Sequence, residues 1–172
     1  EGERLQALLA GGLDIEAQRA PFRVVACEEA HVLDIEGLPV RVVIDRVDEL
    51  DDGRLVVIDY KSGRSVSADS WAEQRIGEPQ LPIYAALAFP DRAVVAVALA
   101  RVTRDAPGFL GVAESEGLLP ELKSLDGQRK LYAEDEFPDW ATLRRLWAER
   151  ITELAREVRD GAAAVVFDDE KN

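Results

Sequence analysis

The chain has 172 residues, of which 47% are hydrophobic, and this predicts one compact domain over residues 1–172. Its formal net charge of −13 argues against autonomous, high-affinity binding of nucleic acid, because DNA-binding domains normally carry a basic surface. The lone cysteine, Cys27, excludes a disulfide framework and a cysteine-held iron–sulfur cluster, and it favours a reducing cytoplasm. No apolar run is long enough to cross a membrane, and no signal peptide is recognisable. Because the sequence lacks methionine, we expect it to be a piece of a longer polypeptide.

Hydrophobic periodicity predicts the following elements in chain order. They are a helix within residues 3–19, strands near 22–35, 38–48 and 54–61, helical segments at 68–76 and 79–89, and strands at 94–102 and 108–113. The two helical segments are separated by Gly77-Glu78-Pro79, which disfavours a continuous helix. Together these elements predict an α/β fold with a central mixed β-sheet flanked by helices.

The last predicted element is a long amphipathic helix. Asp139 is a suitable N-cap and Gly161 a suitable stop. Between them lies an apolar stripe formed by Leu143, Trp147, Ile151, Leu154 and Val158. Residues 103–138 are rich in Gly, Pro and acidic residues, and apart from the strand at 108–113 we expect them to form a long loop or lid.

Two of the predicted strands form a hairpin that brings acidic residues together. The turn at residues 49–53 contains Asp and Gly, and a turn centred near Asp52 places Asp45 opposite Asp59. Opposed side chains have Cβ atoms roughly 4.5–5.5 Å apart, where like charges repel each other. A bridging cation would remove this repulsion. Lys61 joins the pair, because residues two apart on a strand share a face.

This arrangement predicts a magnesium site. Mg²⁺ prefers oxygen ligands and is usually held by one or two carboxylates together with substrate phosphate. Lys61 would orient or deprotonate an attacking water, or neutralise charge that builds on the phosphorus centre. The alternative is an exposed Asp59–Lys61 ion pair without chemistry. We favour a site, because four further residues predict an apolar opposite face and hence a strand pair covered on both sides: Val42, Ile44, Val56 and Ile58.

Three short motifs resemble those of a known family. They are Asp45-Arg46-Val47-Asp48, then Asp59-Tyr60-Lys61-Ser62-Gly63, then Gln80 with Tyr84. In this order they resemble the PD-(D/E)XK nuclease superfamily, and specifically the RecB-like nuclease domains of ATP-dependent helicase–nucleases used in recombination and repair. The resemblance covers residues 37–88.

The resemblance implies a restriction-endonuclease-like core and a Mg²⁺- or Mn²⁺-dependent deoxyribonuclease, more an exonuclease than an endonuclease. Its metal ligands would be Asp45, Asp59 and the backbone carbonyl of Tyr60, and Lys61 would be the catalytic lysine. Gln80 and Tyr84 would line the DNA-binding side. The implied partners are DNA and a helicase domain or subunit of the same complex, with no membrane.

The helix carrying Gln80 and Tyr84 can also be interpreted without the family. Pro79 suits the start of a helix, and residues four apart share one helix face. On this evidence alone, a tyrosine packed in the core is the simpler interpretation for Tyr84.

The chain departs from the family pattern in two ways. Val42 stands where a glycine is usual, and residues 1–20 hold no histidine to act as a further metal ligand. His31, the only histidine, is better explained as a structural imidazole than as a ligand. Glu28 and Glu29 are alternative carboxylates, of which only one can face the site, because adjacent strand residues face opposite ways.

These departures, with the negative charge, leave a second hypothesis open. The chain would then be a catalytically inactive module that keeps the fold to bind DNA or a partner protein. Under the nuclease hypothesis we expect a local basic patch to contact phosphates, formed by Arg41, Arg46, Lys61, Arg64 and Arg75.

Overall fold

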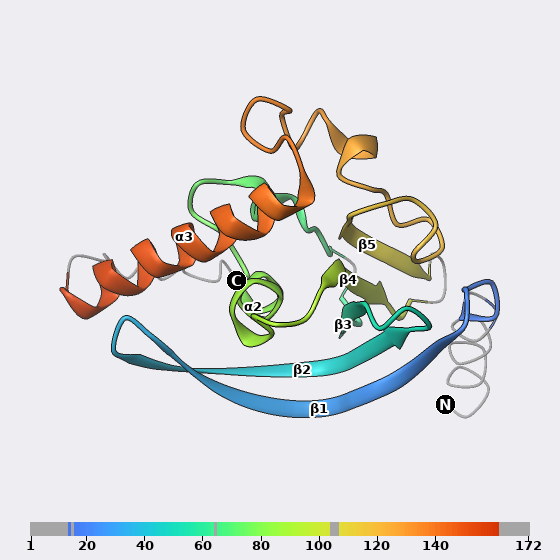
Figure 1. Ribbon diagram of the computed structural model, residues 1–172, viewed down its shortest axis with the longest axis horizontal. Coiled ribbons are helices and arrows are strands. Elements are labelled where there is room, and N and C mark those ends of the chain that lie inside the picture. The colour runs from blue at the N-terminus through green and yellow to red at the C-terminus, as the bar shows by residue number, and fades with distance from the viewer. Residues whose placement is uncertain (1–13, 15, 64, 104–106, 162–172) are drawn as a thin grey trace, which may run out of the picture.

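The computed structural model of the protein describes residues 14, 16–63, 65–103 and 107–161 (Figure 1). Its centre is a five-stranded sheet with the strand order β1-β2-β3-β4-β5. The strands are β1 (Phe22–Ile35), β2 (Leu38–Leu50), β3 (Leu55–Lys61), β4 (Val94–Arg101) and β5 (Gly108–Ala113). The helical elements are η1 (Asp69–Ala72), α2 (Gln80–Ile83), η2 (Tyr84–Ala88), η3 (Asp126–Gln128) and α3 (Trp140–Arg159).

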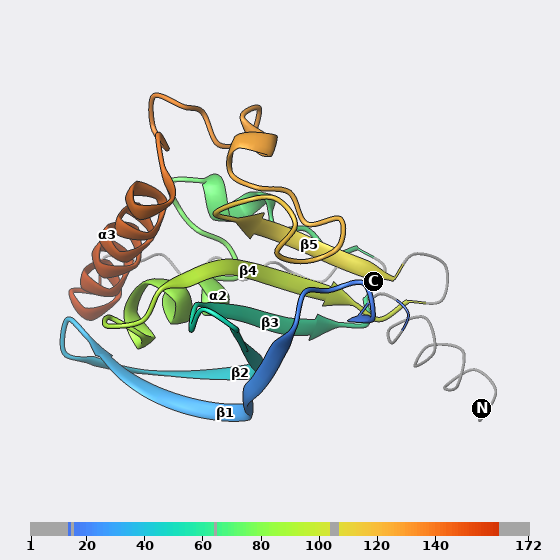
Figure 2. The same cartoon turned by 45° about the vertical axis from the view of Figure 1, so that its right-hand side comes forward.

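The sheet is mixed. Strands β1, β2 and β3 are antiparallel in turn, β3 and β4 are parallel, and β5 returns antiparallel to β4. Strands β1 and β2 form a long curved ribbon, and α2 lies between this ribbon and α3 (Figures 1 and 2). This arrangement confirms the predicted α/β fold, in which a mixed sheet flanked by helices has a restriction-endonuclease-like core.

Both faces of the central strands β3 and β4 are buried. On the side of α2 and α3, a helix-side cluster includes Val47, Val57, Leu99, Tyr84 and Trp147. The opposite face carries a loop-side cluster that includes Val56, Ile58, Ala98, Phe109, Leu119 and Leu122. Strands β3 and β4 therefore have apolar residues on both faces, as expected for central strands covered on both sides.

The predicted grouping of Val42 and Ile44 with Val56 and Ile58 is wrong. Val42 and Ile44 belong to the helix-side cluster, as Val47 does, so the alternation of faces along β2 shifts between Ile44 and Val47. The shift coincides with an irregular place in β1, where Glu28 has a φ of 49°. An irregular place in a pair of strands can redirect a side chain. The residue of β2 at this place is Asp45.

Tight turns set the register of the hairpins. Glu36 and Gly37 both have positive φ angles, 55° and 83°, which is the geometry of the turn that joins strongly twisted antiparallel strands. In the next hairpin Gly53 has a φ of 84°, and Leu50 donates a hydrogen bond to the Arg54 carbonyl over 2.9 Å. The pair Val47 and Val57 then face each other, which confirms the register predicted from the turn.

Helix α3 begins where predicted. The Asp139 side chain accepts a hydrogen bond from the Thr142 backbone N–H over 2.7 Å, which is the expected N-cap. Leu143, Trp147 and Ile151 are buried as predicted, but Val158 is 52% exposed. The apolar stripe thus ends at Ala155, one turn before the end of the helix.

The remaining elements differ in length from the predictions. The helix expected at residues 68–76 is the single 3₁₀ turn η1, whereas the helix expected at 79–89 is present as α2 followed by the π-helical turn η2. Most of the helix expected within residues 3–19 lies outside the described residues. Within the described residues, no helix is both long and apolar enough to cross a membrane.

Candidate active site

The two acidic residues of the hairpin converge where β2 and β3 separate. The hydrogen-bonded ladder ends at the pair Arg46 and Ile58, and the next positions along it are Asp45 and Asp59. Asp45 Oδ2 accepts a hydrogen bond from the Tyr60 backbone N–H over 2.7 Å. The Asp45 side chain therefore reaches across to β3, immediately beside Asp59.

Asp59 is almost fully buried, with 7% of its surface exposed. Burial raises the pKa of its carboxyl, the Lys61 ammonium opposes this, and the neighbouring Asp45 carboxylate adds to the increase. Lys61 Nζ lies 2.9 Å from Asp59 Oδ2, and this contact raises the pKa of the lysine. Two carboxylates and one ammonium thus share a small, partly buried space.

The donor set suits a hard divalent cation. Asp45 and Asp59 offer carboxylate oxygens from neighbouring strands, and a dication between them would relieve both the burial of Asp59 and its repulsion by Asp45. Among the residues that the structure describes, no group of three or more His, Cys, Asp or Glu is arranged to hold a metal. Protein ligation would thus come from these two carboxylates and backbone oxygen, with water and substrate completing the shell.

A cavity of about 210 Å³ opens beside this cluster. Besides Asp59 and Lys61 it is lined by Trp71, Glu78 and Gln80. Sequence reasoning missed Trp71 and Glu78 as site residues. The only signal for Glu78 was its position in the break between the two predicted helices, where it adopts an unusual φ of 44°.

Gln80 and Tyr84 both lie next to the site, in different environments. The exposed Gln80 side chain donates a hydrogen bond to the Val43 carbonyl of β2, two residues before Asp45. Tyr84 is fully buried in the helix-side cluster, and its hydroxyl lies 3.2 Å from His31 Nε2. Burial, together with the charge of Glu29, raises the pKa of the Tyr84 hydroxyl. Contact of either side chain with DNA stays a prediction.

His31 has the contacts of a structural imidazole. Its ring packs edge-on against Tyr84 and Phe89, with ring centroids 5.1 Å and 6.1 Å apart. Its Nε2 is also 3.2 Å from Glu29 Oε1. Glu28 is exposed and sits on β1 between the pairs Cys27–Arg46 and Glu29–Ile44, which places it level with Asp45.

The other two polar residues of the Asp45–Asp48 motif point to the opposite face and build an ionic network. Asp48 is fully buried, and Arg46 donates to it through Nε and Nη2 over 2.7 and 2.9 Å. Arg19 lies 2.7 Å from the same carboxylate. Arg46 Nη1 also donates to the Tyr60 hydroxyl over 3.0 Å and to Glu16 over 2.9 Å. Burial lowers the pKa of the Arg46 guanidinium, but the contacts with Asp48 and Tyr60 outweigh this effect, so the pKa is raised above its ordinary value.

This network corrects the predicted basic patch. Arg46 pairs with Asp48 in the ionic network behind β3, and Arg75 pairs with Glu157 of α3 over 3.2 Å, so neither lies at the carboxylate pair. Arg41 pairs in register with Val32 on the distant part of the ribbon, while Arg64 lies outside the described residues. Of the predicted set, Lys61 alone is placed at the carboxylate pair by the described contacts.

A mixed sheet with two strand-borne carboxylates beside a strand-borne lysine is the architecture of nucleases with a restriction-endonuclease-like core. A comparison with models of protein families agrees, matching residues 2–167 to the PD-(D/E)XK nuclease superfamily. The chain belongs to this superfamily. A search of the curated proteins found none that matches this chain.

Proposed function

We propose that the protein is a divalent-metal-dependent deoxyribonuclease that hydrolyses phosphodiester bonds. The observation that carries this proposal is the convergence of Asp45 and Asp59 beside Lys61 at the open end of one hairpin. Membership of the PD-(D/E)XK nuclease superfamily supports nuclease activity in general. The choice of metal, DNA as the substrate and the partners belong to the proposal.

In this proposal Asp45, Asp59 and the backbone carbonyl of Tyr60 hold Mg²⁺ or Mn²⁺. When bound, the ion stabilises charge on the phosphate and lowers the pKa of the attacking water. The hydrogen bond from the Tyr60 N–H orients the Asp45 carboxylate. The Lys61 ammonium, 2.9 Å from Asp59, neutralises negative charge as it builds on the non-bridging oxygens. Gln80 would bind the substrate from the helical side, and the fully buried Tyr84 would position the helical segment that follows it.

We further propose an exonuclease that works with a helicase domain or subunit in DNA recombination or repair. The RecB-like order of the three motifs supports this role. The net charge of −13 counts against autonomous binding of DNA, but not against cleavage of a strand that another domain delivers to the site. The exposed Cys27 is the only cysteine of the chain, which supports a reducing compartment such as the cytoplasm.

End-labelled linear single-stranded DNA and an internally labelled circular single strand test the activity. We expect Mg²⁺ or Mn²⁺ to support cleavage of the linear strand, EDTA to abolish it, and the circle to survive because it offers no end. The Asp59→Asn variant should be inactive, while Asp51→Asn, which changes an exposed aspartate at the hairpin turn, should remain active. Absence of divalent-dependent cleavage in the parent protein would contradict the proposal.

The second candidate is an inactive module that binds DNA or a partner protein. It is favoured by the absence of a third acidic or histidine ligand in the described part of the chain. Calorimetric titration with Mn²⁺ separates the two. The nuclease requires binding that is lost in Asp59→Asn, whereas an inactive module would show no such site-dependent binding.

A further inference from the structure

A second positive side chain stands beside Lys61 on the neighbouring strand. Arg101, the last residue of β4, is paired in parallel register with Lys61, and the Val102 N–H donates to the Lys61 carbonyl over 2.9 Å. Neighbouring strands are about 4.8 Å apart, and paired residues of parallel strands share a face. The Asp59–Leu99 pair behaves in this way, because both residues line the cavity at the metal site. Arg101 of β4 therefore adds a second positive charge on the same face of the sheet, one strand away from Lys61.

The described part of the fold gives Arg101 no counterion. Its Nε atom is buried and has no hydrogen-bond partner among the described residues. Arg46 and Arg144 are satisfied, by Asp48 and by the Ala85 carbonyl over 2.8 Å. Arg19 also has two buried nitrogens without a partner, Nε and Nη2, but it pairs with Glu16 and Asp48, whereas Arg101 forms no ion pair within the described residues. The Nε atom has almost no accessible surface, so an anion would bind Arg101 through its Nη groups, which are not among the buried donors without a partner.

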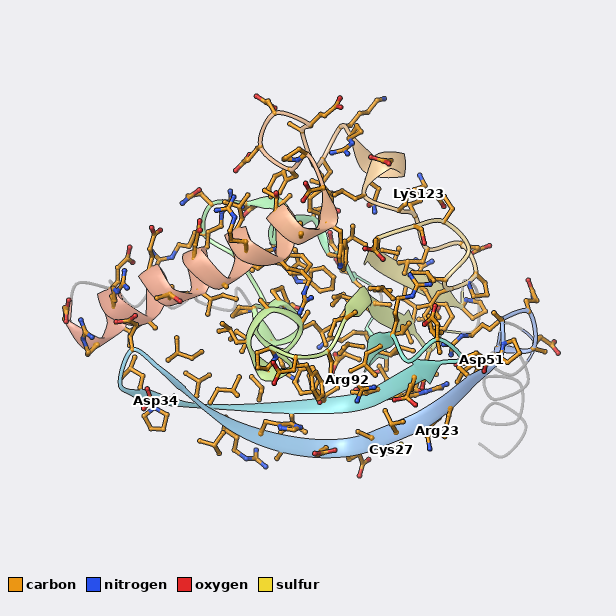
Figure 3. All side chains as sticks on the ribbon, viewed as in Figure 1. Arg23, Cys27, Asp34, Asp51, Arg92 and Lys123 are labelled. Atoms are coloured by element: carbon orange, nitrogen blue, oxygen red, sulfur yellow. The ribbon has the colours of Figure 1, made fainter. Side chains whose placement is uncertain are left out.

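Arg101 also lines a second cavity, of about 400 Å³. This volume falls within the range of sites for small organic ligands. Leu110, Leu131 and Tyr132 provide apolar lining for a planar ring, and Ser67 and Lys123 provide polar groups. Lys123 lies on the loop near β5 (Figure 3). The cavity is thus larger than an inorganic anion requires.

Two exposed carboxylates, Asp69 and Glu121, line the same cavity. They disfavour a simple phosphate or sulfate site, because they repel a free anion. They suit a ligand that carries hydrogen-bond donors as well as an anionic group. A nucleotide has this character, with a phosphate for Arg101 and exocyclic amino groups for carboxylate acceptors. Glu121 lies on the Arg101 side of the cavity, because a Cβ atom at Gly108 would be 3.1 Å from Glu121 Oε2 and 3.9 Å from Arg101 Nη2.

We propose that this cavity is a subsite for one nucleotide at the end of the DNA strand, next to the bond that is cut. Arg101 binds its phosphate, and the base occupies the space lined by Leu110, Leu131 and Tyr132. The inference rests on the proposed nuclease function and deepens it, since it assigns a place to the end of the strand. It also explains how an acidic domain would hold a short, terminal part of DNA without a broad basic surface.

Binding of mononucleotides in EDTA tests the subsite without cleavage. Calorimetry with the 3′- and 5′-monophosphates of deoxyadenosine should detect binding of at least one by the parent protein, and Arg101→Gln should weaken it about tenfold or more. Arg101→Lys should restore part of the loss. Arg145→Gln is the matched control, because it removes the same charge from an exposed arginine that pairs with Glu149 on α3. Equal melting temperatures would show that the variants are folded.

With single-stranded DNA and Mg²⁺, Arg101→Gln should raise KM about tenfold and change kcat little. The reason is that Arg101 binds a phosphate beside the reacting one, and this contact is the same in the bound substrate and in the transition state. A parent protein that binds neither monophosphate, or an Arg101→Gln variant that binds as tightly as the parent, would overturn the subsite. If the parent still cleaves DNA in that case, the nuclease function stands. If mononucleotides bind through Arg101 but no divalent ion supports cleavage, the nuclease function fails and the nucleotide site remains.

Discussion

Asp45 accepts a hydrogen bond from the Tyr60 N–H over 2.7 Å, so the first carboxylate of the site is fixed to the strand that carries the second. Tyr60 lies between Asp59 and Lys61, so its backbone fixes Asp45 within this group of charges. The same residue uses its side-chain hydroxyl on the opposite face, where it accepts from Arg46 over 3.0 Å. A single residue thereby links the candidate metal site to the ionic network behind it.

Asp59→Asn should remove the stabilisation that divalent metal gives to the fold. Ligand that binds the native state at one hundred times its Kd stabilises by about 2.7 kcal/mol. We therefore expect Mg²⁺ or Mn²⁺ to raise Tm in the parent and in Asp51→Asn, and to leave Tm of Asp59→Asn unchanged. In EDTA the Tm of Asp59→Asn should equal or exceed that of the parent, because burial and Asp45 disfavour the ionised carboxylate. Differential scanning calorimetry measures both. A full metal-induced shift in Asp59→Asn would exclude Asp59 as a ligand.

Lys61→Gln should separate catalysis from metal binding. The Lys61 side chain is 41% exposed and its ammonium contacts Asp59, so its loss leaves the carboxylate pair in place. We expect kcat to fall by about a hundredfold or more, which is typical when a group that stabilises transition-state charge is removed. Mn²⁺ affinity should be retained or increase, because the ion no longer competes with the lysine. Lys130→Gln, an exposed lysine on the 114–139 loop, should change neither quantity. Unchanged kcat in Lys61→Gln would rule out a catalytic role.

Asp48→Ala should destabilise the protein strongly although Asp48 contacts neither metal nor substrate. Its carboxylate is fully buried between Arg19 and Arg46, and its removal leaves two buried guanidinium groups without their shared acceptor. Breaking a buried ion pair in this way costs about 3–5 kcal/mol. Urea denaturation followed by tryptophan fluorescence measures the loss. Asp51→Asn should stay within about 0.5 kcal/mol of the parent, as exposed substitutions do. A comparably small effect of Asp48→Ala would mean that the network contributes little to folding.

Gln80→Ala should weaken substrate binding more than metal binding. The side chain borders the cavity at Asp59 and Lys61, where a bound strand would pass. We expect KM for single-stranded DNA to rise about tenfold, the effect of losing a hydrogen bond to a charged group, with kcat within about twofold of the parent. Steady-state kinetics test this. If Mn²⁺ affinity falls instead and KM holds, the contact between Gln80 and the Val43 carbonyl positions β2, and Gln80 has no substrate role.

The hairpin could be predicted from the sequence because its information is local. The turn residues at positions 49–53 fix the register, and alternation then places Asp45, Asp59 and Lys61. Helix α3 was equally accessible, since a cap, a stop and a regular stripe lie within one segment. Both are short-range signals that need no knowledge of distant residues.

What could not be predicted depends on contacts between distant segments. The change of face in β2 lies opposite Glu28 of β1, whose φ is positive, and the sequence of β2 does not reveal it. Arg46 appears available for phosphate in the sequence, but in the fold it binds Asp48 and Glu16, the latter thirty positions earlier. The segment at 68–76 has helical composition, yet it forms a single 3₁₀ turn whose buried Trp71 packs edge-on against Trp147 of α3. These features involve residues from different segments, which a local pattern does not relate to one another.

Anomalous diffraction from a crystal of the parent protein soaked in Mn²⁺ tests the central claim most directly. We predict a peak within coordination distance of both the Asp45 and the Asp59 carboxylates, beside Lys61. A crystal with Mn²⁺ bound elsewhere, or with no peak at these two side chains, would contradict the metal site and with it the proposed chemistry.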